Sequence, residues 1–290
     1  MYIKIITSLI AMLILSSSIC GEEILDSGSD SPEPIVTSES IELPILMYHF
    51  LVENRGELHI CPSEFELDLQ FLKANGYNTI GITDLLDFVY SNKPLPENPI
   101  MLTFDDGYYN NYKHGFTLLQ QYKQKAVIFI IGEHIDLWSD DFYEDIEVGH
   151  MTWEHIRKML DSGLVEFGSH THNLHKLESD CGRRGASRNN GECLSEFRTI
   201  FEDDANKFVT RMIEETGITP VSFAFPFHAV CEYAVQILKE LRYRVIFTYR
   251  GNNAINLITP YQPETLFNLY RINRCSLRSA ESILQDIRLS

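Results

Sequence analysis

The feature that most restricts the fold of this chain is a repeated alternation of short apolar runs with longer helical patterns. Apolar runs typical of buried strands occur about seven times between Leu43 and Arg274, and most are followed by a helical pattern. An unbroken run such as the one at 126–131 is typical of a strand covered on both faces. Strands that alternate with helices form parallel sheets or barrels, so the sequence predicts an α/β fold.

The domain organisation follows from length and local composition. A chain of 290 residues, 44% of them hydrophobic, suits one sizeable domain. Residues 1–20 have a weakly positive start, a short apolar run and then small residues, as in a secretory signal peptide. Residues 21–42 are rich in Ser, Glu, Asp and Pro and are expected to form a flexible linker. The catalytic domain is then expected at 43–290.

The N-terminal pattern also predicts where the protein works. Cys20 is either removed with the signal peptide or carries a lipid anchor, and the bulky Ile19 before it favours removal. We therefore expect a secreted, periplasmic or cell-envelope protein, a lipoprotein in the second case. The formal net charge of −17 argues against a nucleic-acid partner and against adsorption to an acidic membrane surface.

Export would place the cysteines in an oxidising compartment. The polar, glycine-rich segment 179–193 reads as a surface insertion, and the short loop between Cys181 and Cys193 makes a disulfide between them feasible. The alternative is two free thiols in a mobile loop. The sequence contains no CxxC spacing, which disfavours a cysteine zinc site.

Two adjacent carboxylates directly follow one of the predicted strands. The run Pro99–Phe104 is predicted to be a buried strand, and Asp105, Asp106 and Gly107 come next. The carboxyl ends of strands are where α/β sheets and barrels carry their chemistry. One carboxylate could then bind a metal while the other faces the substrate. The alternative is an Asp-Gly turn that caps the following helix.

A group of histidines follows another predicted strand, Leu164–Phe167. His170, His172 and His175 lie within six residues, and imidazole nitrogen with carboxylate oxygen suits zinc or a neighbouring first-row ion. In a strand residues 170 and 172 share a face, whereas in a helix 172 and 175 do. Periodicity therefore favours any pair that contains His172. Each histidine could instead be an ordinary surface or core residue.

Several segments together resemble the polysaccharide deacetylase family, the NodB-homology or carbohydrate esterase family 4 proteins. They are Thr103–Tyr108, Gly168–Thr171 and Ser222–Phe227. Leu46–His49 and the segment 153–170 are similar to its poly-β-1,6-N-acetylglucosamine deacetylase branch. The resemblance spans roughly residues 43–275. It implies a distorted (β/α)7 barrel and metal-dependent hydrolysis of N-acetyl groups on an extracellular glycan.

The resemblance also implies roles for individual residues. Asp105 corresponds to the catalytic base and Asp106 to a metal ligand. Related deacetylases use the first histidine of the cluster and one five residues later, which selects His170 and His175 and requires an irregular turn between them. Zinc is the expected ion, with nickel, cobalt and iron as alternatives. The backbone N–H of Phe227 is the expected donor to the oxyanion.

The chain departs from the family pattern in three places. The arginine that usually precedes the proline motif is absent, since Ala224 and Phe225 stand there. His228 occupies a place commonly held by glycine, and the C-terminal leucine-x-histidine motif, which supplies the general acid elsewhere, has no counterpart. His49 stands in the Met-Tyr-His context implicated as the acid in related deacetylases, and His228 is the second choice.

The expected function is therefore a metal-dependent polysaccharide N-deacetylase. The expected partner is a polysaccharide, an N-acetylglucosamine polymer such as poly-β-1,6-N-acetylglucosamine, a chitin-like glycan or peptidoglycan, and the protein is expected to be a monomer. The alternatives are an O-acetyl esterase acting on xylan and an inactive glycan-binding barrel. A phosphatase is disfavoured, because its two carboxylates are usually separated by one residue.

Overall fold

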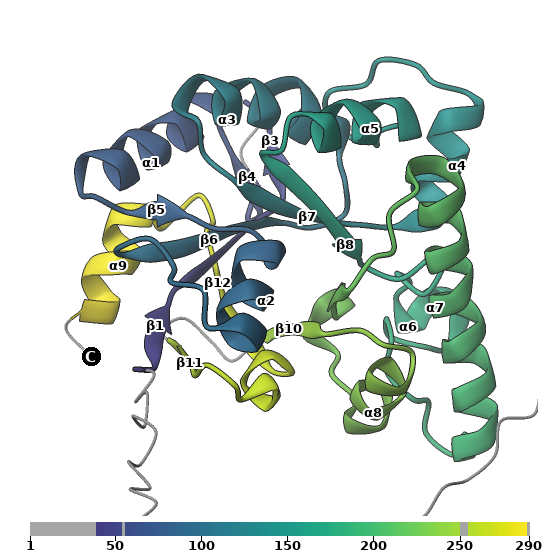
Figure 1. Ribbon diagram of the computed structural model, residues 1–290. Coiled ribbons are helices and arrows are strands. Elements are labelled where there is room, and N and C mark those ends of the chain that lie inside the picture. Colours follow the sequence, from purple (N-terminus) through teal and green to yellow (C-terminus); the bar gives the residue numbers. More distant parts are fainter. Residues whose placement is uncertain (1–38, 54–55, 250–254, 289–290) are drawn as a thin grey trace, which may run out of the picture. The chain divides into compact units, whose positions relative to one another are not determined.

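Parallel strands form a closed ring at the centre of the molecule. The computed structural model describes residues 39–53, 56–249 and 255–288 (Figure 1). The ring order is β2-β12-β10-β9-β8-β7-β6, and β6 pairs with β2 to close it. The strands are β2 (Ile45–Tyr48), β6 (Pro99–Phe104), β7 (Ala126–Ile130), β8 (Val165–Ser169), β9 (Ser222–Ala224), β10 (Val245–Tyr249) and β12 (Leu269–Asn273). The predicted (β/α)7 barrel is confirmed.

Short strands extend this barrel at its edges. β5 (Asn78–Thr79) pairs with β6 outside the ring. β1 (Ile41–Leu43) pairs antiparallel with β11 (Asn256–Ile258), and β3 (Phe50–Leu51) pairs with β4 (His59–Ile60). Residues 41 and 42, which were expected in the linker, therefore lie in a strand. The predicted signal peptide and residues 21–38 lie outside the described residues.

Helices surround the ring, as Figure 1 shows. The α-helices are α1 (Pro62–Ala74), α2 (Ile82–Ser91), α3 (Thr117–Tyr122), α4 (Gly132–Asp140), α5 (Trp153–Asp161), α6 (Glu178–Cys181), α7 (Leu194–Thr216), α8 (Glu232–Glu240) and α9 (Ala280–Arg288). A π-helix, η1 (Asn111–Phe116), precedes α3, and short 3₁₀ turns occur at η2 (Pro226–His228) and η3 (Pro263–Leu266). Within the described part of the chain, no helix has the length and apolar character needed to cross a membrane.

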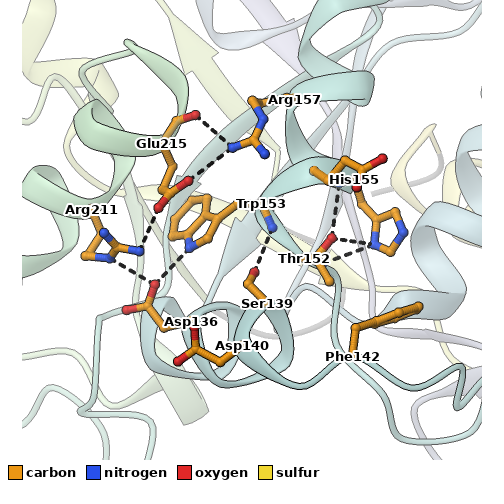
Figure 2. Close-up of a pocket in the computed structure, with 11 residues that line it drawn as sticks. Asp136, Ser139, Asp140, Phe142, Thr152, Trp153, His155, Arg157, Arg211 and Glu215 are labelled. Carbon is orange, nitrogen blue, oxygen red and sulfur yellow. Dashed lines mark hydrogen bonds and ion pairs between the residues drawn. The ribbon is translucent and has the colours of Figure 1, made fainter.

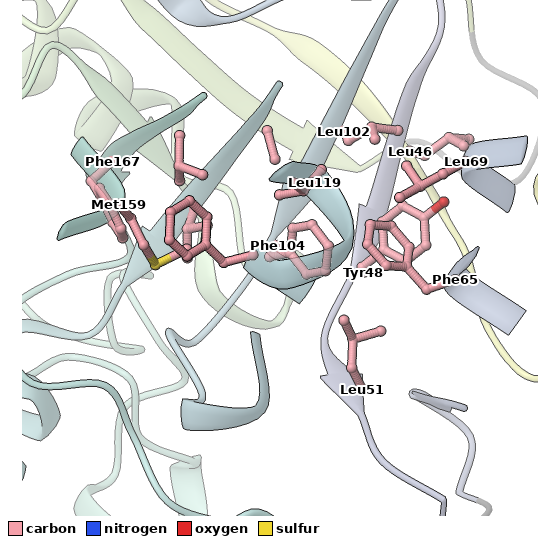
Figure 3. Close-up of a cluster of buried hydrophobic side chains, with 14 of the residues drawn as sticks. Leu46, Tyr48, Leu51, Phe65, Leu69, Leu102, Phe104, Leu119, Met159 and Phe167 are labelled. Carbon is pink, nitrogen blue, oxygen red and sulfur yellow. The ribbon is translucent and has the colours of Figure 1, made fainter. Parts of the chain in front are cut away.

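The two-residue period of the strands separates an outer core from an inner one. Leu102 and Phe104 of β6 point outward into a cluster with helices α1 and α3 (Figure 3). In that cluster the Tyr48 ring stacks on Phe104 at 5.1 Å between centroids. Each such side chain contributes about 1.5–3 kcal/mol by leaving water. Met101 belongs to a different cluster, with Phe129. Because alternate residues share a face, Asp105 continues the face of Met101.

The ring is least regular between β8 and β9. These two strands share a single residue pair, Ser169 with Phe223. Just beyond that pair, Nδ1 of His170 lies 2.8 Å from the carbonyl oxygen of Ala224. A side chain of the expected metal site therefore joins the two strands where the backbone ladder ends.

Candidate active site

A buried ion pair holds the first carboxylate at the carboxyl end of β6. Arg271 of β12 donates two hydrogen bonds to Asp105, Nη1 to Oδ1 at 2.5 Å and Nη2 to Oδ2 at 2.8 Å. The side chain of Arg271 is 0% exposed and that of Asp105 is 4% exposed. Burial opposes ionisation, but the Arg271 charge and hydrogen bonds hold the pKa of Asp105 below its ordinary value. Asp105 is therefore a carboxylate near neutral pH.

The second carboxylate leaves the strand through a turn of left-handed residues. Asp106 has φ +71° and Gly107 has φ +74°. A Cβ atom on residue 107 would lie 2.8 Å from Cγ2 of Ile130, so this position needs glycine for space as well as for conformation. Gly107 N donates to Asp105 O at 2.9 Å and closes the turn. Since the backbone turns here, the carboxylates of residues 105 and 106 can face different partners.

Asp106, His170 and His175 form one cluster of candidate metal ligands. Nε2 of His175 lies 3.2 Å and Nε2 of His170 lies 3.6 Å from Oδ1 of Asp106. One ligand atom from each residue lies within 4.8 Å of the other two. The pair that the family resemblance implied, His170 with His175, is the pair that the fold brings to Asp106. His172 does not join the cluster.

The donor atoms of this cluster suit a divalent cation. A carbonyl oxygen can only accept, so His170 carries its proton on Nδ1 toward Ala224, and Nε2 faces Asp106 with a free lone pair. Oδ1 of Asp106 is buried without a hydrogen-bond partner. Burial opposes ionisation of Asp106, yet the neighbouring imidazoles of His175 and His170 hold its pKa well below the ordinary value. Two imidazole nitrogens and one carboxylate oxygen form a typical ligand set for catalytic zinc.

An irregular turn connects the two histidines, and the start of α4 holds it. Thr171 has φ +76°, which neither a strand nor a helix contains. Gly132 N donates to Thr171 O at 3.1 Å, and Glu133 N donates to His172 O at 2.8 Å. These donors have no partner inside the helix because they belong to its first turn. The helix terminus therefore positions the loop that carries His175.

A carboxylate from α7 holds the same loop from the other side. Asp204 accepts from His172 N at 2.8 Å and from Asn173 N at 2.7 Å. Burial raises the pKa of Asp204 to about 6, although both of these hydrogen bonds oppose the increase. The main chain of the loop is therefore held by α4 on one side and by the Asp204 carboxylate on the other.

We expect Gly132→Ala to weaken metal binding through this loop. A Cβ atom at residue 132 would lie 2.4 Å from Nδ1 of His172, which is buried at 2% exposure, so the ring or the loop has to move. The expected loss is about 1–3 kcal/mol of stability, as for overpacking, together with weaker zinc affinity. Urea unfolding and zinc titration would measure both.

The matched control for this substitution is the double variant Gly132→Ala/His172→Ala, which removes the ring that the new methyl group meets. It should recover most of the lost zinc affinity. Equal zinc affinity in Gly132→Ala and the unchanged protein would contradict the role given to this contact.

Comparison with known proteins identifies the family. The family model described as "Polysaccharide deacetylase" matches residues 92–246, just over half of the chain. The chain belongs to the polysaccharide deacetylase family. It is 30% identical over 201 residues to the poly-β-1,6-N-acetyl-D-glucosamine N-deacetylase of Escherichia coli K12, which covers 63% of this chain and 30% of that protein. The chain thus spans less than a third of the length of that relative.

Two further members of the polysaccharide deacetylase family resemble the chain over most of its length. The poly-β-1,6-N-acetyl-D-glucosamine N-deacetylase of Staphylococcus aureus N315 is 24% identical over 260 residues, 82% of this chain and 83% of that protein. The de-N-acetylase of Aggregatibacter actinomycetemcomitans superposes with a TM-score of 0.70 at 22% identity, covering 85% of this chain and 100% of that one. The second likeness supports the fold alone.

Arg271 is a residue of the candidate site that sequence reasoning missed. The family arginine was expected before the proline motif, where the chain has Ala224 and Phe225. In the structure a guanidinium reaches Asp105 from β12 instead. The signal that could have found it is an arginine between Tyr270 and Ile272 inside a predicted strand, since buried arginines are almost always paired.

The two candidate acids border this site differently. Nε2 of His49, which directly follows β2, lies 3.9 Å from Oδ2 of Asp105. The ring of His228 stacks on Tyr249 at 4.1 Å. Burial, with the Arg271 charge nearby, lowers the pKa of His228 to about 4, so this ring is an uncharged imidazole near neutral pH and a poor proton donor. His49 is therefore the better placed of the two.

Phe227, the expected oxyanion donor, borders the metal cluster. Its ring lies 4.3 Å from that of His175, and the guanidinium of Arg184 lies over the Phe227 ring at 5.6 Å. Its backbone has φ +54°, which is rare for a residue with a large side chain. The main chain at this position is thus held next to the cluster in an unusual conformation.

The expected disulfide is not formed in the structure. Cys181 and Cys193 are both free and exposed. Sγ of Cys193 accepts from Glu196 N at 3.4 Å and so caps α7. The insertion is closed by another contact, because Arg183 and Glu192 form a largely buried ion pair between the two cysteines. A cross-link is therefore not needed to order this loop.

A pocket of about 510 Å³ lies between α4, α5 and α7 (Figure 2). Two ion pairs line it: Arg211 Nε lies 2.9 Å from Asp136 Oδ1, and Arg157 Nη1 lies 3.1 Å from Glu215 Oε2. Trp153 Nε1 donates to Asp136 as well, at 2.8 Å. The pocket is a polar crevice that links the helices, and no residue of the candidate site lines it.

Proposed function

We propose that this chain is a metal-dependent polysaccharide N-deacetylase whose substrate is a polymer of N-acetylglucosamine. The observation that carries the proposal is the position of the Asp106, His170 and His175 cluster beside Asp105, a carboxylate kept ionised by Arg271. The relatives named as poly-β-1,6-N-acetyl-D-glucosamine N-deacetylases support this substrate class. The apolar N-terminal residues 1–20 support action outside the cytoplasm.

In this proposal Asp106, His170 and His175 hold the metal ion. A bound divalent ion would acidify water and polarise the acetamide carbonyl. Asp105 takes the proton from the attacking water, because it is an ionised carboxylate at the mouth of the barrel. The backbone N–H of Phe227 donates to the oxygen on which negative charge develops.

The leaving group needs a proton, since an amine anion cannot depart near neutral pH. His49 supplies it in our proposal. Its Nε2 lies 3.9 Å from Oδ2 of Asp105, so acid and base border the same space. The carbonyl oxygen of His49 accepts from Nδ2 of Asn111 at 2.7 Å, which fixes the residue where it leaves β2.

Acetate release tests the proposed function. The purified protein would be incubated with β-1,6- and β-1,4-linked N-acetylglucosamine oligomers and with acetylated xylan. We expect acetate from at least one N-acetylglucosamine oligomer, loss of release with a chelator, and recovery with added zinc. Faster release from xylan would favour the O-acetyl esterase instead. No release from any glycan in the presence of zinc, nickel, cobalt or iron would overturn the proposal.

We expect His49→Ala to lower turnover of the amide substrate by about 10²–10⁴-fold, the usual range for one acid–base group. Bound metal should be unchanged, because His49 is not in the ligand cluster. Hydrolysis of an activated acetyl ester should fall much less, since its leaving group needs no proton. The matched control is His228→Ala, for which we expect no such difference between substrates. Equal losses on amide and ester in His49→Ala would count against His49 as the acid.

A further inference from the structure

A buried histidine outside the ligand cluster contacts the main chain of Asp106. His150 lies between α4 and α5, is 7% exposed, and forms an isolated antiparallel bridge with Tyr108. Its Nδ1 lies 3.2 Å from the carbonyl oxygen of Asp106. Its Nε2 lies 3.1 Å from Nδ1 of His134 in α4. A chain of two imidazoles therefore runs from α4 to the turn that carries a candidate metal ligand.

The order of these contacts fixes where the protons lie. The Asp106 carbonyl can only accept, so Nδ1 of His150 carries the proton and donates. The ring is buried and its two hydrogen-bond partners are a carbonyl oxygen and another imidazole, so the uncharged ring is favoured. Nε2 of the uncharged ring is then an acceptor, and Nδ1 of His134 must be the donor to it. In this way His134 selects the His150 tautomer that can bind Asp106.

The contact matters because of the conformation of Asp106. With φ +71° this residue occupies a region that residues other than glycine seldom adopt. The neighbouring main-chain bond, Met151 N to Gly107 O at 3.0 Å, acts on the following residue. The His150 imidazole instead binds the peptide group of Asp106 itself. Without this donor a buried carbonyl oxygen would lose its partner, and the turn could relax toward an ordinary conformation.

We propose that His150 is a positioning residue that holds Asp106 in the left-handed conformation required for metal binding, and that His134 fixes the tautomer of His150. The inference rests on the proposed metal site. It adds two residues that touch neither the metal ligand atoms nor the substrate. Partners of metal ligands typically change metal affinity by 10–100-fold when they are replaced.

Two amide substitutions at residue 150 separate the donor from the ring. Asn places its amide close to the position of Nδ1 and can still donate to Asp106, whereas Gln extends to the position of Nε2 and faces His134. We expect the zinc dissociation constant, measured by competition with a chromophoric chelator, to rise about 10–100-fold in His150→Gln. It should rise less than about threefold in His150→Asn. His155→Gln replaces a half-buried histidine of α5 and should leave zinc affinity unchanged.

Two measurements on the metal-free protein complete the test. Thermal unfolding should give similar midpoints for the Asn and Gln variants. A difference in zinc affinity between the two then cannot come from a difference in stability. Nitrogen-15 NMR of the imidazoles should show the proton of His150 on Nδ1, and His134→Ala should reduce that preference. A proton on Nε2 in the unchanged protein would overturn the inference.

The outcomes also distinguish this inference from the proposed function. No zinc binding by the unchanged protein would overturn the metal-dependent function itself. Normal zinc binding by the unchanged protein, with equal affinity losses in His150→Asn and His150→Gln, would overturn only the positioning role of His150.

Discussion

Asp105→Asn is expected to lower the rate of acetate release by about 10²–10⁴-fold while the protein still binds zinc. The amide has nearly the shape of the carboxylate, but it cannot take a proton from water near neutral pH. Asp105 is not in the ligand cluster formed by Asp106, His170 and His175, so metal content should stay close to that of the unchanged protein. Acetate assays and metal analysis of the same sample would measure both quantities.

The matched control is Asp106→Asn, the same substitution one residue further on. Asp106 supplies the carboxylate oxygen of the ligand cluster, so this variant should lose zinc affinity as well as activity. Retained turnover in Asp105→Asn would show that residue 105 is not the base. Loss of metal from both variants alike would show that the two carboxylates do not have separate roles.

Arg271→Met is expected to have the largest effect on stability. The change removes one partner of a buried ion pair and leaves the carboxylate of Asp105 without its counter-charge. Breaking a buried pair in this way costs about 3–5 kcal/mol. The pKa of Asp105 should also rise, because burial then opposes its ionisation without the guanidinium to offset it. Urea unfolding would measure the first effect, and the pH dependence of acetate release the second.

The control for Arg271→Met is the double variant Asp105→Asn/Arg271→Met. When residue 105 is uncharged, no buried carboxylate is left without a counter-charge. Arg271→Met should therefore cost less stability in this background than in the unchanged protein. Equal costs in the two backgrounds would contradict a coupling between the residues. The stability of Arg271→Lys should lie between that of Arg271→Met and that of the unchanged protein, since lysine keeps the charge but not the two parallel hydrogen bonds.

Local sequence patterns predicted much of the barrel because its strands are defined by contiguous apolar residues. The expected strand Pro99–Phe104 has the observed bounds of β6. α4 was not predicted. Its first residue, Gly132, resembles the end of the preceding strand, and Ile135 is the only apolar side chain of this helix that is buried. The glycine is there because His172 packs against it, which no local pattern shows.

The site was harder to derive than the fold because its parts come from distant strands. The motif at residues 103–108 indicated Asp105 and Asp106, but periodicity favoured histidine pairs that contain His172. The turn with φ +76° at Thr171, held by α4 and Asp204, instead brings His175 to Asp106. Arg271 follows Asp105 by 166 positions. Its role depends on the closure of the ring, which brings β12 next to β2 and β2 next to β6.

Ring closure also bears on how the protein is made. Asp105 lies in an early part of the chain, whereas the arginine that neutralises it is in β12, the strand that joins β10 to β2. A ribosome-bound or proteolysed chain that ends before residue 271 would bury a carboxylate with no counter-charge, or leave it in water and the ring open. Asp105 therefore gains its counter-charge only after the β12 segment has been synthesised and docked. A growing chain would accordingly lack the complete candidate site for most of its synthesis.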